Sequence, residues 1–262
     1  MSNPIESLPY DVFSQEYDRF VNWPGRLAVE MPFLEAQLKS VGARQVLDAA
    51  CGTGMHAIAL ARLGFQPSGA DLSPAMIDRA RENAISSAVE VRFESASFGQ
   101  LSRAFGSHTF EAVLCLGNSL PHLLTPQELS ATLADFAACL KPGGMLLIQN
   151  RNFDAVMQTR QRWMEPQSAR EGQSEWLFLR FYDFDPDGLI TFNILTLRRQ
   201  GSQPWTQSLI TTRLRPILAA EMRSALLAAG FGAIQFFGDM TGSSFDPSTS
   251  GNLVVTAILG NN

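Results

Sequence analysis

A short apolar run passes into a glycine-rich turn at Gln45–Ala57, which reads QVLDAACGTGMHA. The apolar part, up to Ala50, has the length and composition of a buried β-strand, and helical periodicity follows the turn as far as Leu63. Gly52 and Gly54 let the chain reverse sharply, because glycine has no Cβ. The stretch therefore predicts a strand, a tight turn and a helix in immediate succession, which is the first unit of an α/β fold.

The same alternation continues along the chain. Further strand-like runs, separated by helical segments, follow at residues 65–70, 89–93, 110–116 and 145–149. Two signals mark helix starts: Ser73 stands before Pro74, and Thr125 is followed by Glu128 at the spacing of a capping box. Strands and helices that alternate in this way predict a parallel, doubly wound sheet with helices on both faces.

The two ends of the chain have different patterns. Residues 10–40 are predicted to be helical, with Pro24-Gly25 ending the first helix and with an aromatic stripe formed by Tyr10, Phe13, Tyr17 and Phe20. After residue 175 the pattern predicts three antiparallel strands, at 176–183, 189–198 and 206–215. A helix at 219–229 and strands at 234–237 and 253–259 are predicted to complete the fold.

Together these elements predict a single domain over residues 1–262 of the α/β class. We expect a doubly wound, mostly parallel, seven-stranded Rossmann-like sheet, with an amino-terminal helical lid and an inserted antiparallel three-stranded meander. We assign the lid to residues 1–40, the core to 41–174, the meander to 175–217 and the closing helix and strands to 218–262.

Composition narrows the class of protein. Apolar residues make up 45% of the 262 and charged residues only 17%, as in ordinary globular proteins. The net charge of −5 disfavours a nucleic-acid partner. The three cysteines and three histidines show neither a disulfide framework nor metal-ligand spacing, so we expect no metal. The first residues lack a secretory pattern and no stretch approaches ~18 apolar residues, so we expect a cytoplasmic protein without a membrane partner.

The glycine turn and a downstream acidic residue form a candidate nucleoside site. In an open parallel sheet, ligands bind beyond the carboxyl ends of the strands. Gly52–Ala57 satisfies the pattern G-x-G-x-x-G/A, and Asp71 lies 17 residues after Gly54, at the end of the second predicted strand. A carboxylate there could accept hydrogen bonds from both hydroxyls of a ribose. The pattern alone permits NAD, S-adenosylmethionine, or a tight turn that holds no ligand.

Four segments extend this pattern to a known family. Residues 46–54, VLDAACGTG, resemble the first motif of the class I S-adenosylmethionine-dependent methyltransferases, and residues 69–73, GADLS, resemble their acidic second-strand motif. Residues 110–116 and 140–144 resemble their fourth strand and the turn before the fifth. The resemblance covers residues 10–150 and implies S-adenosylmethionine as the cofactor and methyl transfer as the reaction.

The glycine and sarcosine N-methyltransferases resemble the chain more closely. Residues 116–123, LGNSLPHL, are similar to their fourth-strand loop, and residues 150–154, NRNFD, to the fifth-strand loop whose Arg holds the substrate's carboxylate. Residues 26–30, RLAVE, resemble the segment whose Arg holds the cofactor's methionyl carboxylate. The chain departs from this group at Ser97-Phe98, which replaces an Asn- or Asp-Trp pair beside the adenine, and in its shorter amino-terminal arm.

We expect the cofactor site at the carboxyl ends of the strands. Asp71 would hold the ribose, and Asp48 would accept N–H groups of the glycine turn and order the cofactor's ammonium. The resemblance gives Arg26 the methionyl carboxylate. Ser97 and Phe98 would either contact the adenine or serve as a helix cap and a core residue. The expected cofactor-binding residues are Arg26, Asp48, Ala50, Gly52, Gly54, Asp71, Leu72, Met76, Ser97, Phe98 and Leu116.

Three residues are candidates for the acceptor side of the site: Asn118, His122 and Arg151. Asn118 offers a carbonyl that could orient an amine, and the guanidinium fork of Arg151 suits a carboxylate. Arg151 could instead pair with Asp154 or with a carboxylate of the meander, and His122 is equally consistent with a structural role. Alignment of nucleophile, methyl carbon and sulfur is the main requirement, so no dedicated base is needed.

The sequence therefore predicts a methyltransferase that acts on a small molecule, in its finer form on the amine of a small carboxylate-bearing compound. The alternatives are a non-amine acceptor, an NAD-dependent oxidoreductase and a binding module without catalysis. An oxidoreductase would need a Tyr-Lys or Cys-His arrangement, which the sequence does not show. The meander would either form a homo-oligomer interface or cover the acceptor site with Arg180, Tyr182, Arg198, Trp176, Phe178 and Phe181.

Overall fold

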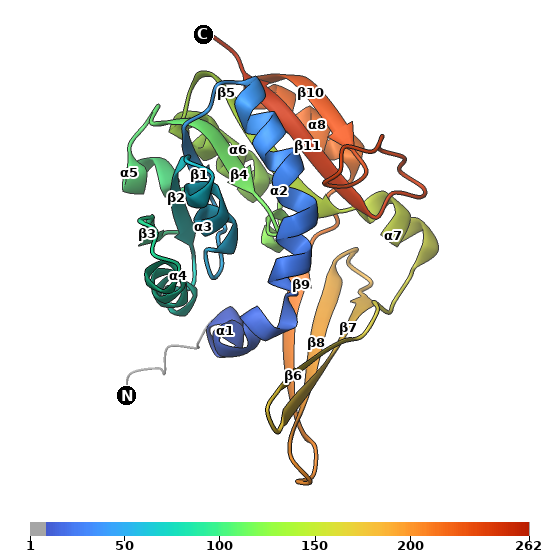
Figure 1. Ribbon diagram of the computed structural model, residues 1–262. Coiled ribbons are helices and arrows are strands. Elements are labelled where there is room, and N and C mark those ends of the chain that lie inside the picture. The colour runs from blue at the N-terminus through green and yellow to red at the C-terminus, as the bar shows by residue number, and fades with distance from the viewer. Residues whose placement is uncertain (1–8, 262) are drawn as a thin grey trace, which may run out of the picture.

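The computed structural model describes residues 9–261 and contains two β-sheets (Figure 1). The larger sheet has seven strands in the order β10-β11-β5-β4-β1-β2-β3. Strands β1 to β5 run parallel to one another, whereas β11 is antiparallel to both β5 and β10. This confirms the mostly parallel seven-stranded sheet. The strands are β1 (Gln45–Asp48), β2 (Gln66–Asp71), β3 (Arg92–Ser95), β4 (Phe110–Cys115), β5 (Leu140–Arg151), β10 (Phe231–Phe237) and β11 (Asn252–Leu259).

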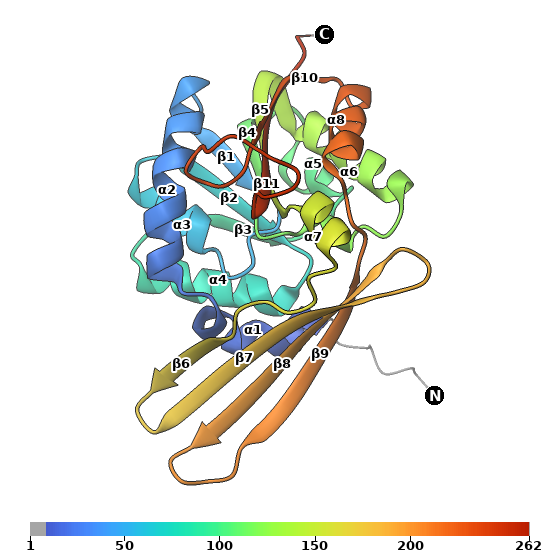
Figure 2. The ribbon, with the colours of Figure 1, turned by 90° about the vertical axis from the view of Figure 1, so that its right-hand side faces the viewer.

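Helices cover both faces of this sheet (Figures 1 and 2). One face packs against α2 (Trp23–Ser40), α3 (Met55–Arg62) and α4 (Pro74–Ser86), and the other against α5 (Leu101–Phe105), α6 (Pro126–Cys139) and α8 (Ala219–Ala228). Successive side chains of a strand point to opposite faces. Val46 accordingly packs with Leu34 and Leu38 of α2, and Leu47 with Phe136 of α6. Both faces are buried, which is why the strands are continuously apolar, and the doubly wound prediction is confirmed.

The smaller sheet is antiparallel and has four strands, not the three predicted. They are β6 (Gln167–Glu171), β7 (Ser174–Phe184), β8 (Ile190–Gln200) and β9 (Thr206–Leu214), and α7 (Phe153–Thr159) precedes them. The missed strand, β6, reads QSARE and shows no apolar alternation. Its pairing with β7 depends on a two-residue turn in which Gly172 has φ +56°. The meander therefore starts at residue 167 and not at 175.

Helix α1 (Pro9–Phe20) lies between the two sheets (Figure 2). The prediction that Pro24-Gly25 ends this helix is wrong, because both residues belong to the first turn of α2. Proline is tolerated there, since its missing N–H would have no partner in any case, and Asn22 caps the helix by accepting the N–H of Gly25 at 3.2 Å. The side chains of Tyr10 and Phe13 lie outside the described residues, whereas Phe20 packs edge-on against Phe178 of β7, with ring centroids 5.4 Å apart.

Both predicted helix caps are present. Ser73 accepts the N–H of Met76 at 3.1 Å, and Thr125 and Glu128 form the reciprocal capping box at the start of α6. A short 3₁₀ turn, η1 (Leu120–His122), follows β4. Between residues 9 and 261 no helix is both long and apolar enough to cross a membrane.

Candidate functional site

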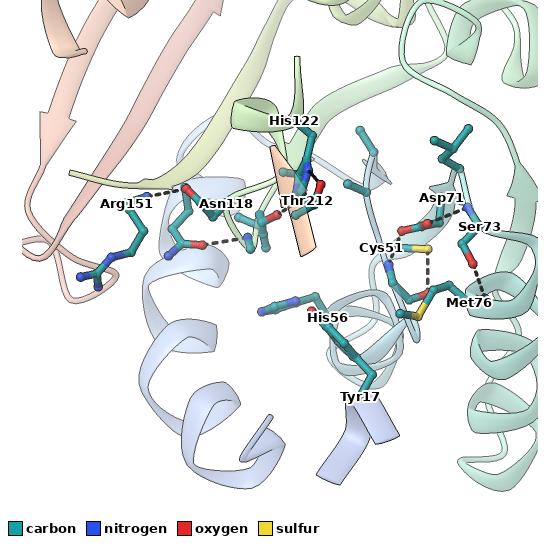
Figure 3. A pocket seen from close by; sticks show the side chains of 18 of the residues that line it. Tyr17, Cys51, His56, Asp71, Ser73, Met76, Asn118, His122, Arg151 and Thr212 are labelled. Atoms are coloured by element: carbon teal, nitrogen blue, oxygen red, sulfur yellow. Dashed lines mark hydrogen bonds between the residues drawn. The ribbon is translucent and has the colours of Figure 1, made fainter. Parts of the chain in front are cut away.

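A cavity of about 650 Å³ opens beyond the carboxyl ends of β1, β2, β4 and β5 (Figure 3). Helices α1 and α2 and the small sheet form its remaining walls. Its volume is within the range of small-molecule sites. Every sequence-predicted site residue lines it except Asp48 and Gly54. The predicted residues that do line it are Arg26, Ala50, Gly52, Asp71, Leu72, Met76, Ser97, Phe98, Leu116, Asn118, His122 and Arg151.

Two backbone hydrogen bonds fix Asp71 at one end of the cavity. Its Oδ2 accepts the N–H of Gly52 at 2.9 Å, and its Oδ1 accepts the N–H of Ser73 at 3.0 Å. We expected a glycine-turn N–H on Asp48, and the structure gives the N–H of Gly52 to Asp71 instead. The carboxylate of Asp71 is therefore rigidly placed beside the glycine turn before any ligand arrives.

Asp48 lies behind the glycine turn. Its side chain is 1% exposed, and neither carboxylate oxygen has a hydrogen-bond partner among the described residues. Burial raises the pKa of this carboxyl to about 6. A buried carboxylate without a partner is costly, so a cation close to the turn would stabilise it. The expected interaction with the cofactor's ammonium stays a prediction.

The two glycines of the turn have different tasks. Gly54 has φ +79°, and a Cβ there would lie 2.7 Å from Cζ of Phe93. It is needed for packing between the turn and β3, which explains why it does not line the cavity. Gly52 has φ +52°, and the nearest atom to a Cβ there is Cε1 of Tyr17, at 3.7 Å. Any side chain at Gly52 would enter the cavity between the turn and α1.

Arg26, Glu30 and His56 form a connected group on the cavity wall. The Nε of Arg26 lies 3.0 Å from both carboxylate oxygens of Glu30, and Glu30 Oε2 lies 2.6 Å from Nε2 of His56. Although burial raises the pKa of Glu30, the hydrogen bond with His56 and the charge of Arg26 bring it below its ordinary value. Nη2 of Arg26 lies 4.0 Å from the Cβ position of Gly117, so its outer edge faces the loop after β4.

Sequence reasoning missed Glu30 and His56 as members of this site. The spacing of Arg26 and Glu30, four residues apart on a helix, was the available signal for an ion pair. His56 sits in the first turn of α3, and only the packing of α2 against α3 brings it to Glu30.

Apolar side chains line the wall beside Asp71. Met76 is 2% exposed, whereas Leu72 is 56% exposed at the rim. Phe98 packs edge-on against Phe136, with ring centroids 5.6 Å apart, and Ser97 precedes it on the cavity wall. This part of the cavity therefore has the character expected for a flat, largely apolar ring such as adenine.

The loops after β4 and β5 are tied together at the other end of the cavity. Asn118 has φ +66°, and its Oδ1 accepts the backbone N–H of Arg151 at 2.9 Å. Gln149 Oε1 accepts the N–H of Gly117 at 2.8 Å. The carbonyl that we expected to orient an amine thus already has a structural task. A carbonyl oxygen has two lone pairs, so a second bond to an amine stays a prediction.

Arg151 lies at the end opposite Asp71 (Figure 3). Among the side chains that the structure describes, its Nε is buried without a hydrogen-bond partner and no acid forms an ion pair with it. The alternative partner, Asp154, instead accepts the N–H of Ala219 at 2.9 Å. The guanidinium of Arg151 therefore presents a positive charge to the cavity without a protein counter-ion.

His122 contacts the small sheet next to this charge. Its Nδ1 lies 3.4 Å from Oγ1 of Thr212. Burial lowers the pKa of the imidazole to about 4, so the ring is neutral at neutral pH. It can exchange hydrogen bonds with a ligand but adds no positive charge to this end of the cavity.

The small sheet forms one wall of the cavity, and two of the six side chains named for it from the sequence, Arg180 and Tyr182, line that wall. The lining residues are Arg180, Tyr182, Phe192, Ile194 and Thr212. Of the residues expected to close the pocket, Trp176 and Phe178 pack against α1. Phe181 points to the opposite face, 4.8 Å from the ring of Trp163, and Arg198 lies over Trp176. Within the described part of the chain, no group of three or more possible metal ligands is present.

Comparisons with known proteins agree with this fold. A family model described as a methyltransferase domain matches residues 46–144. A methyltransferase from Clostridium acetobutylicum superposes with a TM-score of 0.77 at 16% identity, covering 96% of this chain and 99% of its own. The CcbJ methyltransferase from Streptomyces caelestis superposes with a TM-score of 0.75 at 24% identity, covering 98% and 100%. The chain carries a class I S-adenosylmethionine-dependent methyltransferase domain.

Characterised relatives match part of the chain. A glycine/sarcosine N-methyltransferase from Aphanothece halophytica is 37% identical over 163 residues, which are 59% of this chain and 61% of that protein. The glycine N-methyltransferase of Rattus norvegicus is 33% identical over 144 residues, 51% and 49% of the two chains. The chain thus matches only about half to three fifths of the length of these relatives.

Proposed function

We propose that this protein transfers a methyl group from S-adenosylmethionine to the amine of a small molecule that carries a carboxylate. The observation that carries the acceptor half is the guanidinium of Arg151, which lacks a counter-ion and shares one cavity with Asp71 and the glycine turn. Relatives named for glycine and sarcosine support the same class of acceptor.

The cavity residues fit the proposed cofactor. When bound, S-adenosylmethionine supplies a methyl group on a positively charged sulfur. The fixed carboxylate of Asp71 suits a ribose diol, and the partnerless carboxylate of Asp48 suits an ammonium. Arg26 offers its outer edge to the methionyl carboxylate while Glu30 holds its Nε. Gly52 leaves room for close approach at the turn.

On the acceptor side, Arg151 would bind the carboxylate with both arms of its fork and so fix the attached amine in place. A positive charge beside an ammonium lowers the ammonium's pKa, which favours the neutral nucleophile. Asn118 is tied to the backbone of Arg151 and would orient the amine. The neutral ring of His122 adds no competing charge, and Phe192 and Ile194 help to exclude water. Orientation of the amine toward the methyl group is then the main catalytic contribution of the chain.

The test is a methyl-transfer assay with Arg151→Lys. Lysine keeps the charge and loses the fork, so we expect KM for amines with a carboxylate to rise by about 10-fold or more, with cofactor affinity nearly unchanged. Arg162→Lys is the matched control, because Arg162 pairs with Asp183 outside the cavity.

The acceptor panel decides between amines and other nucleophiles. It contains amines with and without a carboxyl group, a phenol, a catechol and a nucleobase. If the protein prefers a phenol, a catechol or a nucleobase, Arg151 does not bind the acceptor as proposed. The proposal of methyl transfer itself would be unaffected. NAD binding in calorimetry without S-adenosylmethionine binding would remove the whole proposal.

A further inference from the structure

A second arginine, Arg180, faces the same end of the cavity from the small sheet. It lies on β7 and lines the cavity with Tyr182, two residues later on the same face of the strand. Its Nε is buried without a hydrogen-bond partner, and its guanidinium carbon lies 5.0 Å from the ring centroid of Phe20. The aromatic contact fixes the side chain but does not neutralise its charge.

The acids on the cavity wall are too few, and too well occupied, to balance this charge. Among the lining residues that the structure describes, only Glu30 and Asp71 are acidic. Glu30 pairs with Arg26 and His56, and Asp71 holds two backbone N–H groups at the opposite end. No ion pair to Arg180 is present in the described part of the chain. Both arginines line the same cavity, and burial together with the charge of Arg151 lowers the pKa of Arg180.

We propose that the acceptor carries two negative charges in addition to its amine, one for Arg151 and one for Arg180. The second charge is a further carboxylate or belongs to a phosphate or phosphonate, because the guanidinium fork fits both. This inference rests on the proposed function and makes its substrate class more specific.

One carboxylate would leave the site unbalanced. A partly buried charge without a partner is strongly unfavourable, and the bound cofactor's sulfonium adds another positive charge to the same cavity. The imidazole of His122 is neutral at neutral pH and carries no negative charge. The phenol of Tyr182 also stays neutral, because burial raises its pKa. A glycine-sized monocarboxylate would neutralise Arg151 or Arg180 but not both. An amine with two anionic groups gives each guanidinium group a partner.

The first experiment measures binding without turnover. The protein, saturated with S-adenosylhomocysteine, is titrated calorimetrically with propionate, succinate, phosphoglycolate and phosphonoacetate. We expect the dianions to bind the unaltered protein at least about 10-fold more tightly than propionate. Arg180→Gln should abolish that preference. Arg198→Gln, on the same sheet with its guanidinium over Trp176 and off the cavity wall, should retain it.

The second experiment measures turnover with glycine, sarcosine, aspartate, iminodiacetate and phosphoserine. The acceptor with the higher kcat/KM, whether its second anionic group is a carboxylate or a phosphate, identifies that group. Arg180→Gln should lower kcat/KM for the preferred dianionic acceptor by about 10- to 100-fold and for sarcosine by less than about 3-fold.

Equal binding of propionate and the dianions, or equal losses for mono- and dianionic acceptors in Arg180→Gln, would overturn the inference. Turnover of sarcosine that depends on Arg151 but not on Arg180 would leave the proposed function intact. If Arg151→Lys leaves the protein's affinity for every carboxylate ligand unchanged, the proposed function is wrong as well.

Discussion

The two ends of the cavity are built in different ways. At the cofactor end, Asp71 is held by the N–H groups of Gly52 and Ser73, and the turn itself is fixed by packing against β3. At the acceptor end, Arg151 and Arg180 each have a buried Nε without a hydrogen-bond partner. The carboxylate of Asp71 thus already has hydrogen-bond partners in the protein, whereas the two arginines of the acceptor end depend on an anion from outside.

This difference has a physical origin. The cofactor end consists of backbone close to the strand ends, so the same hydrogen bonds stabilise the fold and shape the site. The acceptor end is made of long side chains from two separate sheets. Such a wall can change its ligand preference through single substitutions without altering the fold.

The largest expected effect is on the cofactor end. Gly54→Ala should destabilise the protein by about 2–5 kcal/mol, since the left-handed backbone costs ~1–2 kcal/mol and the collision with Phe93 adds ~1–3 kcal/mol. Gly64→Ala is the control, because Gly64 also has positive φ but no atom within 4 Å of its Cβ position. Urea denaturation of both variants measures the difference. Equal losses would mean that packing of the turn against β3 contributes nothing.

Asp71→Asn should separate the two ends functionally. It removes the charge that receives the N–H groups of Gly52 and Ser73 and the expected ribose hydroxyls, so cofactor binding should weaken by about 1–3 kcal/mol. Calorimetric titration with S-adenosylhomocysteine gives this value. KM for the acceptor at saturating cofactor should stay within about 2-fold. An unchanged cofactor affinity would remove Asp71 from the ribose site.

At the acceptor end, the buried imidazole of His122 should make the free energy of unfolding depend on pH. Burial lowers the folded-state pKa of His122 from 6.5 to about 4. Below pH 6.5 the unfolded chain binds a proton that the folded protein does not, so stability is lost as pH falls from 6.5 toward 4. At pH 5 this loss is about 1–2 kcal/mol. His122→Gln should lose less stability between pH 7.5 and 5 than the unaltered protein, as measured by urea denaturation at both values. Parallel curves for the two proteins would contradict the neutral, buried ring.

The smallest effect concerns α1 and the start of α2, which close the cavity with Tyr17, Phe20 and Arg26. If they act as a lid, hydrogen exchange in residues 9–30 should slow by about 3- to 10-fold when S-adenosylmethionine is added. Exchange in α6, which does not line the cavity, is the internal control. An unchanged hydrogen-exchange rate in residues 9–30 would show that the cavity is closed equally with and without cofactor.

The cofactor end could be predicted from sequence because local signals determine it. Apolar runs, glycines at a strand end and the cap at Ser73 fix the parallel sheet and place Asp71 next to the turn. The sequence identifies Asp48 as a buried charge and predicts that it accepts N–H groups of the glycine turn. Only the structure shows that the N–H of Gly52 is bound by Asp71.

The acceptor end could be predicted only in part. Arg151 follows a strand of the main sheet, and its position follows from the topology. The register of the small sheet decides that Arg180 and Tyr182 face the cavity and that Phe181 does not. Polar β6 gives no strand signal, and the contact of His56 with Glu30 depends on how two helices pack. Long-range packing of this kind has no local sequence signature.

The most direct test of this account is a crystal structure of the protein with S-adenosylhomocysteine and aspartate or iminodiacetate. The account predicts the ribose hydroxyls on Asp71, the sulfur pointing toward the loop of Asn118, one carboxylate on Arg151 and the other on Arg180. A sulfur that points away from Arg151, or an amino acid bound without contact to either arginine, would contradict it.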